Sequence, residues 1–231
     1  MIFNINCGHT LEGFGSGAVG FINESRETRI LGNRIISLLE KMGHSVIDST
    51  VNYAKSTNDS LKKIIDKTNN KHCDYFVSIH FNAGKGTGSE IYLPDNAFYN
   101  DKTIKPEYKN ASEILKKLNK LGLKNRGNKN GSHLYVIRKN IHKAMLIEVC
   151  FVDNKSDTEL YLKNIDNIAI AIVEGLTGEK VVNEEKCTLA EFEEARKELK
   201  KLGITDGTKP LENITREQVW AMLYRLLKLN K

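Results

Sequence analysis

Short apolar runs alternate with helix-like patterns through the first 180 residues, and this alternation constrains the fold more than any other feature of the chain. Apolar residues that recur every three to four positions predict helices, and short continuous apolar runs predict buried strands. Strands alternating with helices predict an α/β domain with a mainly parallel, twisted sheet of about six strands and helices on both faces. Strands are expected at residues 2–7, 44–48, 74–81, 89–93, 133–137 and 144–149, and helices at 24–42, 60–69, 108–121 and 156–176.

The C-terminal part of the 231-residue chain has a different character. Residues 179–187 are mostly polar and predict a linker after a first domain at residues 1–178. Two capping-box patterns follow, Thr188 with Glu191 and Thr215 with Gln218, and each predicts the start of a helix. Residues 188–231 are therefore expected to form a small all-helical domain.

The formal charge of +6 favours anionic partners, such as cell-wall polymers, nucleic acid or a membrane surface. Lysine and arginine are spread along the chain, which favours a solvated basic surface over a nucleic-acid groove. No apolar run approaches the roughly 18–20 residues that a membrane helix needs, so membrane insertion is not expected.

The N-terminus, MIFNINCGHT, has no basic segment ahead of an apolar stretch. We therefore expect a protein made in the cytoplasm without a signal peptide, which another protein would have to release if it acts outside. Without export, free buried thiols are expected rather than disulfides at the four cysteines, Cys7, Cys73, Cys150 and Cys187.

Several expected strands end in side chains that can carry chemistry. His9 follows the first strand, His80 lies near the end of the third, and Glu148 lies near the end of the last. The carboxyl ends of parallel strands meet at one edge of a sheet, where ligands bind. Glu24 begins the first helix, and a glycine-rich loop can fold it back toward His9.

Two histidines and one carboxylate with an open fourth position form a ligand set typical of catalytic zinc. His9, Glu24 and His80 are the candidate ligands for one such ion. Each also has a structural interpretation, since a strand-end histidine is often a packed residue and a glutamate at a helix start is favoured by the dipole. Glu148 is different because it interrupts an apolar run, where an ionised carboxylate needs a metal, a partner or a raised pKa.

Four motifs occur in one order along residues 1–178: NCGH at 6–9, GAVG at 17–20 followed by NE at 23–24, SIHFNA at 78–83, and LIEVCF at 146–151 with Asn154. In this order they resemble the zinc-dependent N-acetylmuramoyl-L-alanine amidases of the type 3 family, which include bacterial autolysins and many phage endolysins. The resemblance implies that His9, Glu24 and His80 bind zinc and that Glu148 is the catalytic acid/base. It also implies a place beside the substrate cleft for Asn82.

Two positions depart from the pattern of this family. Cys7 stands where many members have aspartate, and Thr10 stands where they have a second glycine. Hydrogen bonds from neighbouring residues to the metal-binding side chains tune metal affinity. The hydrogen-bond partner of the His9 ring is therefore expected to differ from that in the family. A thiolate ligand at Cys7 is a further alternative.

The tail resembles a fragment of an S-layer-homology wall-binding module, at residues 202–208 (LGITDGT) and 215–225 (TREQVWAMLYR). Trp220 and Tyr224 are four residues apart and can share one helix face, which could bind the wall. The alternative is an interaction or dimerisation hairpin with both rings in its core, which would make the protein a homo-oligomer.

Together these features predict a peptidoglycan hydrolase that cleaves the amide between N-acetylmuramic acid and L-alanine with zinc-activated water. A phage endolysin, acting on the wall during host lysis, is the expected biological form. The alternatives are a bacterial autolysin, a zinc peptidase of the stem peptide, and a non-catalytic protein that binds wall or nucleic acid.

Overall fold

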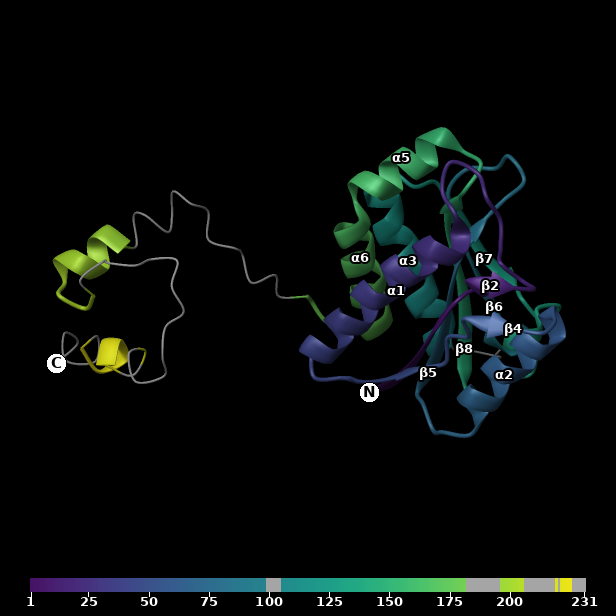
Figure 1. Ribbon diagram of the computed structural model, residues 1–231, viewed down its shortest axis with the longest axis horizontal. Coiled ribbons are helices and arrows are strands. Elements are labelled where there is room, and N and C mark those ends of the chain that lie inside the picture. The colour runs from purple at the N-terminus through teal and green to yellow at the C-terminus, as the bar shows by residue number, and fades with distance from the viewer. Residues whose placement is uncertain (99–104, 182–195, 206–218, 220, 226–231) are drawn as a thin grey trace. The chain divides into compact units, whose positions relative to one another are not determined.

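A six-stranded sheet forms the centre of the computed structural model, in the order β3-β1-β5-β8-β6-β7 (Figure 1). Neighbouring strands run parallel except for the antiparallel pair of β6 and β8. This confirms the predicted α/β fold with a mainly parallel sheet. The strands are β1 (Ile2–Cys7), β3 (Ser45–Asp48), β5 (Tyr75–Asn82), β6 (Ser89–Leu93), β7 (Asn125–Asn130) and β8 (Lys143–Phe151), and β2 (Glu12–Gly13) pairs separately with β4 (Tyr53–Ala54).

Helices cover both faces of the sheet, as expected. On one side, α1 (Glu24–Lys41), α3 (Pro106–Lys120) and α6 (Ile165–Thr177) pack against one another (Figure 1). They enclose the larger core cluster, which includes Phe3, Ile5, Leu31, Ile35 and Ile172. On the other side, α2 (Thr57–Asn69) and α4 (Tyr135–Arg138) cover a smaller cluster that includes Ile64, Phe76, Val136, Ala144 and Leu146.

The first helix shows how the sequence determines this packing. Asn23 caps α1 by accepting a hydrogen bond from the Arg26 amide. Leu31, Ile35 and Leu39 recur every four residues and are fully buried, so one face of α1 lies on the sheet.

Two predicted elements differ from the structure. The apolar run at 133–137 is not a strand but contains the short helix α4, because Val136 and Ile137 are buried against the smaller core cluster. The sixth strand is instead β7, an edge strand of sequence NRGNKN. An edge strand needs little apolar character, and hydropathy gives no signal for it.

The predicted helix at 156–176 is two helices, α5 (Lys155–Lys163) and α6. Asn164, with φ −126° and ψ 22°, ends the first and begins the second. The N-terminal cap of α5 is Asn154, whose side chain accepts a hydrogen bond from the Asp157 amide at 3.1 Å. Ser156 and Glu159 match a capping-box pattern in the sequence, which predicts a helix start at Ser156. Ser156 instead lies within the first turn of α5, so this pattern does not begin the helix.

The structure describes residues 1–98, 105–181, 196–205, 219 and 221–225, and its contacts divide into two units, Met1–Val181 and Val182–Lys231. In the second unit, residues 196–201 are helical and Gly203 follows with a φ of 69°. Arg225 donates a hydrogen bond to the Ile204 carbonyl at 2.8 Å, which joins two segments of that unit. Trp220 and the helix start predicted at Thr188 lie outside the described residues.

The three cysteines within the described residues have free, buried thiols, as expected: Cys7, Cys73 and Cys150. Cys187 lies outside that part of the chain. Among the described helices, none has the length and apolar character needed to cross a bilayer.

Candidate metal centre and active site

His9 lies directly beyond the end of β1, in a backbone conformation that is uncommon for a side-chain-bearing residue. Its φ is 63°, in the left-handed region. The Arg29 guanidinium stabilises this turn by donating to the Gly8 carbonyl at 2.9 Å and to the His9 carbonyl at 2.8 Å. A Cβ atom at Gly8 would clash with the ring of His80, so glycine lets β1 pass close to that ring.

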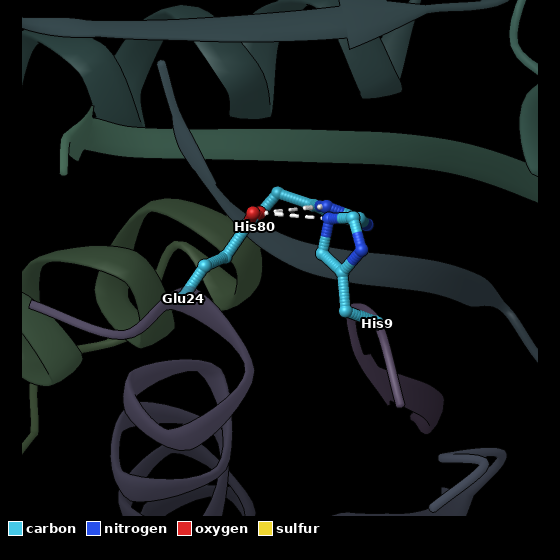
Figure 2. Close-up of side chains that lie close together, drawn as sticks. All are labelled: His9, Glu24 and His80. Carbon is cyan, nitrogen blue, oxygen red and sulfur yellow. Dashed lines mark hydrogen bonds and ion pairs between the residues drawn. The ribbon is translucent and has the colours of Figure 1, made fainter. Parts of the chain in front are cut away.

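Glu24 reaches this turn from the first residue of α1, and its side chain is only 4% exposed. Its Oε1 lies 3.0 Å from Nε2 of His9 and 3.2 Å from Nδ1 of His80 (Figure 2). Backbone amides complete its contacts, with Phe81 donating to Oε1 at 3.0 Å and Ala18 donating to Oε2 at 2.9 Å. The structure therefore brings together the three residues that the sequence analysis singled out as ligands.

The three side chains form a group that could hold a metal ion. One potential ligand atom from each of His9, Glu24 and His80 lies within 4.8 Å of the others. The two imidazole rings meet edge to face, with their centroids 4.9 Å apart. A Cβ atom at Gly17 would lie 2.8 Å from both Glu24 and the His9 ring, so this glycine lets the loop close over the group.

The buried carboxylate and the two imidazoles shift one another's protonation. Burial alone would raise the pKa of Glu24, but hydrogen bonds with His80 and His9 outweigh it and hold this pKa well below its usual range. Burial works to lower the pKa of His9, yet the Glu24 carboxylate raises it overall. The pKa of His80 is lowered, chiefly by burial. Glu24 is thus ionised and able to bind a cation.

The outer contact of His9 comes from the backbone. Its Nδ1 lies 2.9 Å from the Gly15 carbonyl oxygen, which leaves Nε2 directed at Glu24. Cys7, where the family pattern has aspartate, makes no such contact. Its sulfur faces Gly32 of α1, and burial raises the pKa of the thiol. Among the described residues, the group that could hold a metal does not include Cys7.

Glu148 lies on β8 beside this group. It is opposite His80 in the parallel pair with β5 and opposite Glu90 in the antiparallel pair with β6. Its Oε2 is buried and has no hydrogen-bond partner among the described residues. Burial, followed by the negative charges of Glu24 and Glu90, raises the pKa of Glu148 to about 8. This carboxyl group can therefore take up or release a proton near neutral pH.

Glu90, the second residue of β6, is 4% exposed and was not among the predicted site residues. Its Oε1 accepts hydrogen bonds from the Asn82 amide at 2.8 Å and the Tyr92 hydroxyl at 3.0 Å. Its Oε2 lies 2.8 Å from Nε of Arg126. Asn82 is therefore next to the site but has its amide group directed at Glu90. Glu90 interrupts an apolar strand just as Glu148 does, and this signal could have revealed it.

The fold and the position of the site identify the class to which this chain belongs. Two histidines and a buried glutamate gather at the carboxyl edge of a mainly parallel sheet, with a second glutamate on the adjoining strand. Residues 4–178 match the N-acetylmuramoyl-L-alanine amidase family, and the chain belongs to that family, in its type 3 branch.

Individual relatives support this membership. The chain is 34% identical over 178 residues to an uncharacterized 38.4 kDa protein of Clostridium perfringens, covering 73% of this chain and 48% of the relative. It is 32% identical over 153 residues to the endolysin of Bacillus phage SPP1, covering 62% and 55%. The chain thus spans about half the length of these curated relatives.

A solved structure is similar along most of the first unit. It is the catalytic domain of the CD27L endolysin that targets Clostridium difficile, with 28% identity and a TM-score of 0.69. The match covers 78% of this chain and 99% of that domain.

The raised pKa of Glu148 predicts a pH-dependent stability in metal-free protein. Between 4.5, its usual pKa, and about 8, the folded state holds a proton that the unfolded state has released. Stability gained from Glu148 is therefore full below pH 4.5 and is lost as the pH rises, by about 1 kcal/mol per pH unit.

The substitution Glu148→Gln should remove this dependence of stability on pH. Urea unfolding should be measured in the presence of a chelator at several pH values. The free energy of unfolding of the variant should rise relative to that of the parent as the pH increases to 8. Glu40→Gln, at an exposed carboxylate of α1, is the matched control. Parallel pH profiles for the parent and Glu148→Gln would contradict the assignment.

Proposed function

We propose that the protein is a zinc-dependent N-acetylmuramoyl-L-alanine amidase, which hydrolyses the amide between N-acetylmuramic acid and L-alanine in peptidoglycan. The observation that carries this proposal is the group of His9, Glu24 and His80 beside the buried, raised-pKa Glu148, on the fold of this family. The resemblance of the chain to two endolysins favours a role in host lysis, with the cell wall as the site of action.

The donor set fits zinc. Two imidazole nitrogens and one carboxylate oxygen match the ligands of catalytic zinc sites, and they leave room for a substrate oxygen. Glu24 is buried among groups that keep it ionised, so it supplies a negative charge at the place where a cation would need one. When bound there, zinc would supply Lewis-acid chemistry that polarises a carbonyl and makes water more acidic.

The chain's own residues handle the protons. Glu148 accepts a proton from the attacking water at its unpaired carboxylate oxygen, while the water oxygen bonds to the lactyl carbonyl carbon. As the carbon–nitrogen bond breaks, Glu148 returns the proton to the departing nitrogen of L-alanine. Burial of Glu148 raises its pKa, and this helps the carboxyl to hold the proton until the nitrogen departs.

The identity of the cleaved bond is the direct test. Purified cell walls treated with the protein should lose turbidity, and the newly exposed amino termini should be those of L-alanine. Glu148→Gln is nearly isosteric but cannot accept the proton, so its rate should fall by about 10²–10⁴-fold while its zinc content is unchanged. A different new terminal residue would identify a stem-peptide peptidase instead. Activity within a few-fold of the parent would assign the acid/base role to another group.

Metal analysis tests the ligands separately from activity. The parent should contain one zinc per chain, and His80→Ala should lose most of it while circular dichroism shows an intact fold. His72→Ala, at an exposed histidine outside the group, should retain the metal. Full occupancy in His80→Ala would remove His80 from the proposed site.

We also propose that residues 188–231 bind the wall and are not needed for bond cleavage. Each ligand and base assigned here lies in the unit Met1–Val181, and Tyr224 in the second unit is 60% exposed. The tail is nearly charge-neutral, so stacking and hydrogen bonds, with Trp220 and Tyr224 as the candidate aromatic residues, would supply the affinity.

Removing the second unit tests this role of the tail. A chain shortened to end at residue 183 should cleave soluble muropeptides at close to the full rate. It should sediment less with intact walls and clear them more slowly. Equal activity on both substrates, together with a change from dimer to monomer, would show that the tail is an assembly element and would contradict wall binding.

A further inference from the structure

A row of polar side chains crosses four neighbouring strands at the proposed site. His80 of β5 lies opposite Glu148 of β8, and Glu148 lies opposite Glu90 of β6. Beyond β6, Ser89 pairs with Asn125 and Ile91 with Asn128, so an irregularity in β7 places Arg126 beside Glu90. The row thus continues from the proposed metal group, past the proposed acid/base, to a guanidinium.

Arg126 is held on one edge by its neighbours. Its Nε donates to Oε2 of Glu90 at 2.8 Å, and its guanidinium carbon lies 5.0 Å above the ring of Phe151. The Glu90 carboxylate is itself held by Asn82 and Tyr92, so it provides a rigid anchor. These contacts fix the orientation of the guanidinium before any ligand arrives.

The other edge of the guanidinium is available. The Arg126 side chain is 33% exposed, and its Nη1 has only a long contact of 3.5 Å with the Thr87 carbonyl. Among the described residues, none accepts a hydrogen bond from its Nη2. The paired terminal N–H groups of arginine match a carboxylate in a two-point contact.

The separation of Glu148 and Arg126 suits a negatively charged group on the stem peptide, which is the peptide that begins with the L-alanine of the cleaved amide. Strands lie about 4.8 Å apart, so the backbones of Glu148 and Arg126, two strands apart, are separated by about 10 Å. Two residues of extended peptide reach about 7 Å from the scissile bond, and the arginine side chain spans the remainder. The second stem residue is a glutamyl residue joined through its side chain, which leaves an α-carboxylate free or amidated.

We propose that Arg126 binds the free carboxylate of the second stem residue and that Glu90 is the positioning residue that aims it. This inference rests on the proposed amidase function and adds a preference for stems that carry the carboxylate over stems that carry the amide. Without a cation here, the negative charges of Glu90 and Glu24 would repel an anionic stem. Arg126 offsets the nearest of these charges and attracts the substrate.

Two soluble muropeptides that differ only in this group, carboxylate or amide, provide the test. The parent should cleave the carboxylate form with a kcat/KM on the order of tenfold or more higher, as expected for a charge-assisted hydrogen bond. In Arg126→Met this ratio should fall close to one, mainly through a higher KM for the carboxylate form. Arg126→Lys keeps the charge but loses the two-point contact, so it should restore only part of the preference.

Two further variants separate recognition from structural damage. Arg126→Met leaves Glu90 buried without its cation, so the double variant Glu90→Gln with Arg126→Met guards against loss of folding. It should also show a ratio near one. Lys129→Met removes an exposed charge from the same strand and should keep the parent's ratio.

The outcomes are distinct. A parent that cleaves both muropeptides equally, or variants that lose rate on both by the same factor, would overturn the role of Arg126 and leave the amidase function standing. Loss of the preference in Lys129→Met but not in Arg126→Met would assign the recognition to Lys129. A parent that cleaves neither muropeptide would overturn the amidase function and this inference together.

Discussion

The Glu24 carboxylate lies buried at the first residue of α1, where an uncompensated negative charge would cost several kcal/mol. Its partners come from separate parts of the chain: the turn after β1, the loop before α1, and the end of β5. Each partner is therefore drawn to the same point in space. The helix dipole adds to this effect, since an anion at a helix N-terminus is favoured. One buried charge thus ties the first helix to the rim of the sheet.

Three carboxylates lie along this rim, and each is compensated differently. Glu24 has two imidazoles and two backbone amides, whereas Glu90 has a guanidinium, an amide and a hydroxyl. Glu148 has an oxygen with no hydrogen-bond partner among the described residues, so burial and its two charged neighbours raise its pKa. Similar groups on adjoining elements thereby acquire different protonation, and that difference is what acid–base chemistry requires.

Most of the fold and the residues of the group that could hold a metal ion were predictable from the sequence, because both rest on local signals. Buried strands such as β8 are continuous apolar runs, and their ends predicted where His80 and Glu148 would meet. The edge strand β7 was not predictable in this way. It has a neighbouring strand on one side only, so its residues can remain polar. The contact between Glu90 and Arg126 joins residues 36 positions apart and depends on the strand that was missed. Pairing across strands is a property of the sheet order, which no local pattern reports.

The glycine before His9 has a consequence for how this site can change. Any side chain at Gly8 would collide with the His80 ring, which lies over the backbone at that point. The turn that presents one imidazole thus leaves space for the other, and the two cannot be altered independently. A substitution there would displace a ring from Glu24 without touching any ionisable residue. Mutational tolerance at this edge of the sheet is therefore limited by the volume of a single methyl group rather than by charge.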